Sequence, residues 1–435
     1  MKILFCSEFF YPSIGGVQEV VKQLAVRFSK AGHHVEIATT YLDTRKNNFF
    51  ENIKINSFHI SGNYANGILG DVNSYIDFVL NGDFDLIFIY AAQQWTLDAL
   101  IGSLDQIKAK KVLVPCGFSG LYLEQYQAYF NLMPEVLNHF DQLIFHSNNY
   151  RDLEFAKKNS NVPTHLISNA ADNNEFDIQI NGFRRKFGIA KDEFVLLTVG
   201  SITGSKGHLE VIKSFSLLDS KKNLVLILNG NHPGIQFKLN KFSIFKALRN
   251  ALSIKMLKKI MRILFDGFKD FLGIERSYLS KLSRLVKEIN RGHHGSNKRV
   301  ILCDLDRIDL ISSYFESDLF VFASQIEYSP LVLFEACAAG LPFITVDVGN
   351  SLEIVSWTRG GVICPSKHAD NGNTITNPKI LAKHVDQLIS NPSLLISLGR
   401  EGRQSWQKSF NWDLIAKQYE QVFYNLLDIR NSETS

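Results

Sequence analysis

The sequence is short of the residues that mark special classes of protein. Its 435 residues include 5 cysteines, 10 prolines, 4 methionines and 4 tryptophans. The cysteines are odd in number, lie far apart and form no CxxC pair, so we expect neither a disulfide framework nor a zinc knuckle. No apolar run approaches the roughly eighteen residues that a membrane-spanning helix needs. These absences favour a globular protein in a reducing cytosol.

A large excess of one charge is also missing. The chain carries 47 basic and 43 acidic side chains, a net charge of +4, so composition gives no argument for a nucleic-acid partner. Hydrophobic residues make up 45%, which excludes a disordered or fibrous chain, and 33 phenylalanines indicate an aromatic core. The apolar start of the chain is too short for a signal peptide and lacks a cleavage site, so we expect a first β-strand there.

Short, continuous apolar runs recur along the chain, with helix-length segments between them. Such runs are typical of strands covered on both faces, and they predict parallel sheets built from βαβ units. The expected strands are 3–6, 35–38, 85–90, 111–115, 142–147 and 165–168 in the first half, and 194–200, 224–230, 299–303, 318–324 and 343–346 in the second.

The polar stretch 169–191 separates two halves, each of which could close a sheet of ordinary size. We therefore predict an α/β protein with two Rossmann-like, doubly wound domains that face a cleft. The first covers residues 1–172 and the second 173–410, and 411–435 is expected to form a helix that packs back toward the first domain. One large α/β domain is the alternative.

A basic insertion interrupts the second half, because about seventy residues separate two expected strands where a crossover needs far fewer. Residues 236–276 carry ten basic and three acidic side chains, a local net charge of +7 that leaves −3 for the rest of the chain. We predict a helical insertion over about 236–290. At about 100° per residue, 252–272 sorts into a basic face and a wide apolar face. Such a helix either lies on an anionic membrane surface or docks on the protein itself.

A glycine pair, Gly15 and Gly16, stands between the first strand and an expected helix over 17–30. Glycine lets backbone approach a ligand closely, and a helix start favours anions. A tight turn between strand and helix explains the pair equally well.

A second cluster follows the first strand of the second half. That strand ends at Gly200, with Ser201 and Lys206 in the loop after it. Open α/β sheets bind ligands at this carboxyl edge. Lys206 would be a mobile charge suited to a phosphate, with a solvated loop lysine as the alternative.

The third cluster surrounds two acidic residues, Glu327 and Glu335. Pro330 marks the first turn of an expected helix that ends at Gly340. Glu335 lies more than one turn inside that helix, where it is poorly explained as a cap and would suit the paired hydroxyls of a ribose. The amides at the helix start, which could receive phosphate oxygens, belong to Ser329, Leu331 and Val332.

These clusters carry a resemblance to a known family. Glu327 and Glu335 form the E-x7-E pattern of retaining GT-B glycosyltransferases, in the setting SQIEYSPLVLFEACAAGLP. The chain resembles glycosyltransferase family 4, the large glycosyltransferase group 1 family, over nearly its whole length except about 236–290. The further matching stretches are FYPSIGGVQEVVKQLAVRFSKAGHHVEIATT, ISNAADNNEF, LLTVGSITGSKGHLEVIKSF, LILNGN and NWDLIAKQYEQVF.

The resemblance implies a role for each residue of the second and third clusters. Glu335 would bind the ribose of a nucleotide, and Glu327 would contact donor-sugar hydroxyls beside the reacting carbon. Lys206 and the amides of 329–332 would stabilise the leaving diphosphate in place of a divalent metal, so neither metal nor cofactor is expected. The sugar would be transferred with retention, and domain closure would exclude water.

The sequence departs from the family at two points. Ser201 stands where the family usually has Arg, so one phosphate cation is missing or is supplied from elsewhere, for instance by Arg184 or Arg185. A family His near the active site is replaced by Cys116, which Gly117 follows. The acceptor-side chemistry is therefore open, and the stretch 91–95 is a second candidate lining of that pocket.

The leading hypothesis is a glycosyltransferase that uses a UDP- or GDP-linked sugar and a saccharide or lipid-linked acceptor in cell-surface polysaccharide biosynthesis. It would work in the cytoplasm, at the inner face of the membrane if 236–276 binds anionic lipid, and without nucleic acid. A degenerate GT-B binding subunit without catalysis, motivated by Ser201 and Cys116, is one alternative. A GT-B nucleotide-sugar epimerase is another.

Overall fold

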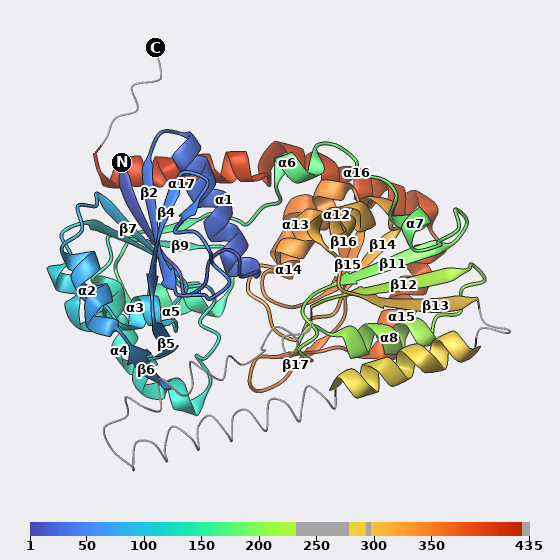
Figure 1. Cartoon of the computed structure of the whole chain (residues 1–435). Helices are drawn as coiled ribbons and strands as arrows, with labels where there is room; N and C mark the ends of the chain where they lie inside the picture. The colour runs from blue at the N-terminus through green and yellow to red at the C-terminus, as the bar shows by residue number, and fades with distance from the viewer. Residues whose placement is uncertain (232–277, 293–296, 429–435) are drawn as a thin grey trace.

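The computed structural model describes residues 1–231, 278–292 and 297–428, which form two α/β domains side by side (Figure 1). Every strand expected from the sequence is present. The predicted basic helix over 252–272 lies outside the described residues. The end of the predicted insertion, residues 278–291, is helical and packs on the second domain, where Leu282 is fully buried.

The amino-terminal sheet has eight strands in the order β10-β9-β8-β7-β1-β2-β4-β3. Neighbouring strands are parallel except β3 and β4, which are antiparallel. Its strands are β1 (Lys2–Cys6), β2 (His34–Thr40), β3 (Phe49–Phe50), β4 (Ile53–Phe58), β7 (Leu86–Tyr90), β8 (Lys110–Val114), β9 (Gln142–Phe145) and β10 (Thr164–Leu166), beside a separate hairpin of β5 (Ile60–Asn63) and β6 (Gly67–Gly70).

Helices cover both faces of this sheet, which explains the continuous apolar runs. Ile3 and Phe5 of β1 enter one core, and Leu4 and Cys6 enter the other. Helices α1 and α17 lie over the first core, and α2 to α5 over the second (Figure 1). Their bounds are α1 (Gly16–Lys30), α2 (Val72–Leu80), α3 (Trp95–Asp98), α4 (Gln127–Asn138), α5 (Arg151–Asn159) and α17 (Trp412–Leu426).

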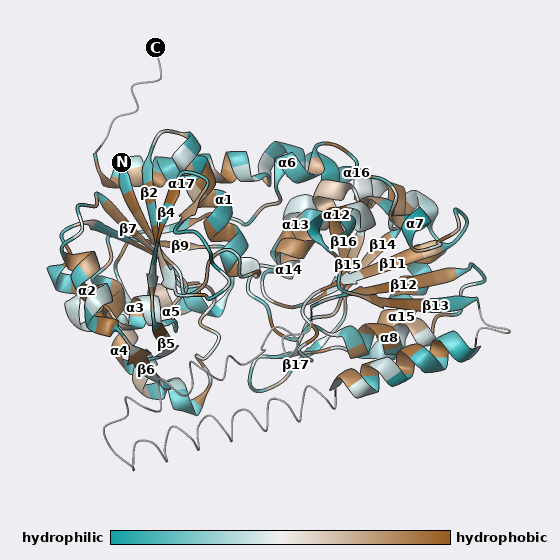
Figure 2. Ribbon diagram, viewed as in Figure 1, coloured by the Kyte–Doolittle hydropathy of each residue, from teal (hydrophilic) through white to brown (hydrophobic). Residues whose placement is uncertain are grey.

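The carboxy-terminal sheet has six parallel strands in the order β13-β12-β11-β14-β15-β16. Its strands are apolar while the outer faces of its helices are hydrophilic (Figure 2). The strands are β11 (Phe194–Val199), β12 (Leu224–Asn229), β13 (Lys298–Cys303), β14 (Leu319–Phe322), β15 (Phe343–Val346) and β16 (Gly361–Cys364), with a small hairpin of β17 (Lys367–His368) and β18 (Thr374–Ile375). The helices are α6 (Asn173–Phe176), α7 (Phe183–Lys186), α8 (His208–Ser216), α12 (Arg307–Glu316), α13 (Leu331–Ala339), α14 (Ser351–Thr358), α15 (Pro378–Ile389) and α16 (Pro392–Ser409).

The chain passes between the domains twice, and the two crossings pair with each other. Ala171 and Asn411 form a parallel bridge, with the Ala171 amide donating to the Phe410 carbonyl at 3.1 Å. Helix α17 then packs on the amino-terminal domain, where Trp412 and Phe423 are buried in the same core as β1. The last described helix therefore completes the core of the first domain.

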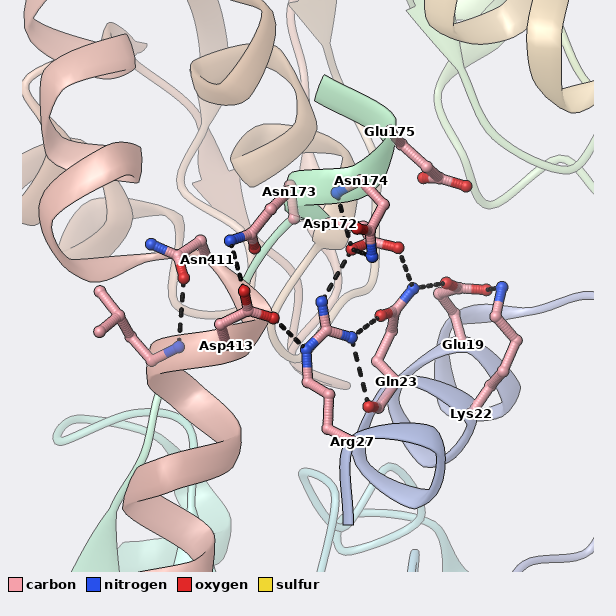
Figure 3. Close-up of polar contacts among 12 residues, drawn as sticks. Glu19, Lys22, Gln23, Arg27, Asp172, Asn173, Asn174, Glu175, Asn411 and Asp413 are labelled. Carbon is pink, nitrogen blue, oxygen red and sulfur yellow. Dashed lines mark hydrogen bonds and ion pairs between the residues drawn. The ribbon is translucent and has the colours of Figure 1, made fainter. Parts of the chain in front are cut away.

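A mostly buried arginine on α1 forms ion pairs with both crossings (Figure 3). The Arg27 side chain is 12% exposed and forms ion pairs with Asp172 Oδ1 at 2.8 Å and Asp413 Oδ1 at 2.7 Å. Gln23, one turn earlier on α1, donates to Asp172 Oδ2 at 3.0 Å. Asp172 immediately precedes α6, and Asp413 lies in the first turn of α17. The cluster therefore links α1 to the two crossings between the domains, which we call the hinge.

Candidate functional site

The order of the carboxy-terminal sheet brings two of the predicted catalytic residues together. Strands β11 and β14 are neighbours although the chain visits two other strands between them, so their carboxyl ends form the topological switch point where ligands bind. Lys206 follows β11 and Glu327 follows β14. Lys206 Nζ lies 2.6 Å from Glu327 Oε1, and the two side chains are 29% and 15% exposed.

Backbone contacts fix the loop that carries Lys206. Gly207 has φ of +74°, and a Cβ there would lie 1.9 Å from the carbonyl oxygen of Ala323. Only glycine fits a left-handed position so close to another backbone. The amide of Gln325 also donates to the carbonyl of Ser205 at 2.8 Å. These contacts therefore fix the positions of the Lys206 loop and the Glu327 loop relative to each other.

Helix α13 carries the second part of the site. Gly340 caps it with φ of +69°, as the sequence predicts, but Pro330 precedes the first turn as N-cap and does not occupy it. The first amides of α13, on Leu331 and Val332, have no partner within the helix and are free to face an anion. Ser329, just before, accepts hydrogen bonds from Asn169 at its carbonyl (3.0 Å) and from Asn350 at its hydroxyl (3.2 Å).

Glu335 lies apart from the ion pair and has partners of its own. It is 8% exposed, and its two oxygens accept from Arg307 Nη2 at 2.7 Å and from the Tyr314 hydroxyl at 2.9 Å. Arg307 also contacts Glu175, which is labelled in Figure 3. Burial lowers the pKa of Arg307, but the charges of Glu335 and Glu175 outweigh burial and raise it well above its ordinary value. A fixed guanidinium therefore orients the carboxylate expected to hold a ribose.

The expectation that Arg184 replaces the missing phosphate cation is wrong. Its guanidinium pairs with Asp318 Oδ2 at 2.7 Å and donates to the carbonyl of Glu193 at 2.9 Å. Both partners precede strands, so Arg184 lies at the amino edge of the sheet, opposite Gly200 and Ser201. Arg185 lies on the same short helix, α7, and is exposed.

The acceptor-side loop after β8 has an unusual backbone. Cys116, Gly117 and Phe118 have φ of +60°, +90° and +45°. A Cβ on Gly117 would lie 2.9 Å from Cγ of Tyr328, so glycine permits the close approach of this loop to the residue after Glu327. Burial raises the pKa of the Cys116 thiol to about 12, which keeps it neutral. The left-handed backbone conformations of Cys116 and Phe118 are strained. Such strain is common at functional sites, where the surrounding packing maintains it.

Tyr328 joins the two domains, and the sequence analysis did not single it out. Its hydroxyl accepts from the His146 amide at 2.9 Å and also bonds Asp152, whose pKa burial raises to about 6. Tyr150 donates its hydroxyl to the Glu327 carbonyl at 2.8 Å. An aromatic hydroxyl between Glu327 and Pro330 was the available sequence signal.

His146 is a buried histidine near the site, but its contacts are structural. Its Nδ1 lies 2.6 Å from the Ile167 carbonyl, which can only accept, so Nδ1 carries the proton. Nε2 then accepts from the Tyr90 hydroxyl at 2.7 Å. Burial lowers the pKa of His146 to about 4, so the ring is neutral.

A cavity of 370 Å³ lies between the domains beside Glu327. Arg151 of the amino-terminal domain lines it, with Nε donating to the Gly117 carbonyl at 3.0 Å and its guanidinium 5.1 Å from the centre of the Tyr150 ring. The opposite wall includes Asp347 and His368, with His368 Nε2 3.1 Å from Asp347 Oδ2. Charged and aromatic groups from both domains thus meet at one cavity, as a two-substrate site requires.

The glycine pair lies at the start of α1, with Gly15 as N-cap and Gly16 as first helical residue. A Cβ on Gly16 would have nothing within 4 Å, and one on Gly15 would lie 2.5 Å from Oε1 of Gln18. Two acids at the same edge of the amino-terminal sheet escaped the sequence analysis. Burial raises the pKa of Glu8 to about 7, helped by Asp98, and burial raises the pKa of Asp98 to about 6.

Neither a cluster of metal-binding side chains nor a membrane-spanning helix is found in the described part of the chain. No group of three or more His, Cys, Asp or Glu side chains there could hold a metal ion. None of the helices described is both long and apolar enough to cross a membrane.

Comparison with known proteins agrees with this geometry. Residues 286–405 match the family model described as "Glycosyl transferases group 1". The chain is 21% identical over 428 residues to N-acetyl-alpha-D-glucosaminyl L-malate synthase of Bacillus anthracis, with 96% of each chain covered.

Solved structures share the whole two-domain fold. Sucrose-phosphate synthase from Thermosynechococcus elongatus superposes with a TM-score of 0.69 at 18% identity, over 99% of this chain and 100% of that one. HepE of Anabaena, solved in complex with UDP, gives 0.68 at 15% identity, over 98% and 100%. At these identities the likeness shows the fold alone.

The resemblance found in the sequence is therefore confirmed at the level of the group, while family 4 stays a prediction. The matched segment contains both Glu327 and Glu335. The second domain is therefore similar to the group 1 glycosyltransferases over this segment, and the chain as a whole has the two-domain GT-B fold.

Proposed function

We propose that the protein is a retaining glycosyltransferase that needs no metal and moves a sugar from a UDP- or GDP-linked donor to a saccharide or lipid-linked saccharide. The observation that carries the proposal is the Lys206–Glu327 ion pair of 2.6 Å at the switch point of the second sheet. HepE, which shares the fold, has been solved with UDP-glucose, which supports a nucleotide-sugar donor.

Lys206 and the start of α13 would bind the diphosphate. Lys206 Nζ would exchange Glu327 for a phosphate oxygen, and Glu327 would then be free to accept from donor-sugar hydroxyls. The amides of Leu331 and Val332 would add fixed dipoles. Charge gathers on the diphosphate as it leaves, so donors already in place lower the barrier most there.

Transfer would proceed on one face of the sugar. The bond from C1 to the diphosphate oxygen breaks while a bond from C1 to the acceptor oxygen forms on the same side. The acceptor proton passes to the departing diphosphate, so no separate base is needed. The Tyr150 and Tyr328 contacts bring the domains together and exclude water from this step.

The proposed setting is cell-surface polysaccharide synthesis at the inner face of the membrane. The support is the local charge of +7 over 236–276. Co-sedimentation with phosphatidylglycerol vesicles tests it, and we expect the full chain to bind and a chain lacking 236–276 not to bind. Equal binding of both chains would contradict a membrane role for this segment.

Glu327→Gln tests catalysis directly. With a panel of UDP- and GDP-sugars, we expect a loss of roughly 10²–10³ in transfer rate, the size typical when one electrostatic contact to a transition state is removed. Glu288→Gln is the matched control, since Glu288 is 58% exposed and pairs only with Arg284 of the described residues. Equal background rates for wild type and Glu327→Gln would instead indicate a binding subunit without catalysis. Proton NMR of the product shows whether the anomeric configuration is retained, and a product formed without acceptor would indicate an epimerase.

A further inference from the structure

A second cavity, larger than the one beside Glu327, lies at the hinge. Its volume is 960 Å³ against 370 Å³ for the cleft cavity. Its walls come from the end of β10, the last turn of α14, one side of α16 and the middle of α17. Helix α16 lies over the carboxy-terminal domain and α17 over the amino-terminal one (Figure 1). The cavity therefore touches both domains, and no residue assigned above to the transfer reaction lines it.

Three cations line this hinge cavity: Arg359, Arg400 and Lys408. Within the described residues none of them forms an ion pair or side-chain hydrogen bond. The one carboxylate of the lining, Glu401, accepts a hydrogen bond from the Ser397 hydroxyl at 3.1 Å. Among the described residues, the lining of the cavity thus carries three solvent-exposed cations and one carboxylate, an excess of positive charge.

Helix dipoles explain only part of this charge. Lys408 lies in the last turn of α16, and Arg359 caps the end of α14, where cations are favourable in any protein. Arg400 lies in the middle of the 18-residue α16, where the dipole has no such effect. Arg359 has φ of +52°, a left-handed position that glycine usually takes. Dipole compensation accounts neither for the arginine at 400 nor for the absence of glycine at 359.

The remaining wall is aromatic. The rings of Trp357 and Phe410 stack with centroids 6.1 Å apart and planes at 15°, and both residues line the cavity. Leu166 adds an apolar side chain that is 39% exposed. Such a wall accommodates a ring or carbon skeleton, while three cations suit a phosphate.

We infer that the hinge cavity binds a small organic molecule that bears a phosphate group. The ligand would contact Ser168 and Gln418 on the amino-terminal side and Arg400 on the carboxy-terminal side. A ligand that bridges two domains binds one interdomain angle better than another. By linkage it then shifts the equilibrium between open and closed cleft. This regulatory site goes beyond the proposed transfer reaction.

Calorimetric titration with inorganic pyrophosphate tests the site. The full chain carries Lys206→Gln throughout, which removes the phosphate cation of the cleft. Adding Arg400→Gln and Lys408→Gln should weaken binding at least about tenfold, because two charge-assisted contacts are lost. The control adds Lys157→Gln and Lys158→Gln, two exposed lysines in the last turn of α5 with the same total charge change. Equal affinity of the two multiple variants would overturn the proposal.

Vesicle binding separates a soluble ligand from a lipid headgroup. We expect Arg400→Gln with Lys408→Gln to leave co-sedimentation with phosphatidylglycerol vesicles unchanged. If these substitutions release the protein from vesicles while pyrophosphate binding is absent, the soluble-ligand proposal is wrong. Neither measurement uses a sugar donor, so both can be read even if the proposed transfer reaction fails its own test.

Discussion

Arg307→Met should weaken nucleotide binding although we expect no direct contact between Arg307 and the nucleotide. Arg307 donates to Glu335 at 2.7 Å, and Glu335 is the carboxylate proposed to accept from a ribose. After the substitution only the Tyr314 hydroxyl, at 2.9 Å, still holds Glu335. The Glu335 side chain can then adopt several rotamers, and ligand binding must restrict it to one.

The expected size follows from that loss of order. Fixing one flexible side chain on binding costs about 0.5–1.5 kcal/mol. At about 1.4 kcal/mol per factor of ten, the nucleotide dissociation constant should rise roughly two- to tenfold. The Arg307 side chain is 39% exposed, so solvent screens part of the ion pair and the loss of folding stability should stay moderate.

Calorimetry with UDP and GDP measures the effect, and Arg299→Met is the matched control. Arg299 forms a similar pair with Glu193, with N–O distances of 3.0 and 2.8 Å, but at the opposite edge of the same sheet. Both variants should lose comparable thermal stability, and only Arg307→Met should lose nucleotide affinity. If the two bind nucleotide equally well, Arg307 does not orient Glu335 for a ribose.

Three further substitutions have defined outcomes. Gly207→Ala should destabilise the fold by more than roughly 1 kcal/mol, because the added Cβ would lie 1.9 Å from a backbone carbonyl oxygen. Gly102→Ala is the control and should not destabilise the fold, because nothing lies within 4 Å of its Cβ. Thermal unfolding measures both variants. Burial raises the pKa of Glu8 to about 7 from the ordinary 4.5, so the folded state loses stability relative to the unfolded state as the pH rises from about 4.5 to 7. Glu8→Gln should therefore raise the unfolding temperature at pH 8 more than at pH 5. Arg27→Met should lower the unfolding temperature more than Lys22→Met, because Arg27 is 12% exposed and Lys22 30%.

Each comparison has an outcome that would contradict it. Equal unfolding temperatures for the two glycine variants would mean that the loop of Lys206 can shift at little cost. A pH-independent difference for Glu8→Gln would mean that Glu8 ionises normally in the folded protein. Equal losses for Arg27→Met and Lys22→Met would mean that the hinge cluster adds nothing beyond a surface ion pair.

Most of the strands that the sequence predicted are buried on both faces, although β10 is exposed and β13 only partly buried. Runs such as β7 and β11 are buried on both faces and therefore read as continuous apolar stretches. Strand β4 has buried and partly exposed positions near the sheet edge, and β16 has only four residues, of which the first is the second of two adjacent glycines. The hairpin of β5 and β6 contains three glycines and little apolar character. Sheet-edge elements are specified by their neighbours more than by their own pattern.

The site divides in the same way. Lys206, Glu327 and the start of α13 were predictable because each lies in a local pattern of strand, loop and helix. The partners of Glu335 were not, because Arg307 and Tyr314 reach it from another helix. The expectation for Arg184 was wrong because sequence distance from Gly200 does not reveal which edge of a sheet a residue occupies.

Helix α17 sets an order for folding during synthesis. Trp412, Tyr419 and Phe423 fill the same core as Phe5 and Phe88, yet they are made more than three hundred residues later. While the ribosome is still translating the second domain, the first has a complete sheet with an apolar face that α1 covers only in part. The nascent chain must keep that face from aggregating until its last helix emerges. A stop codon shortly before Asn411 would therefore damage the domain that was synthesised first.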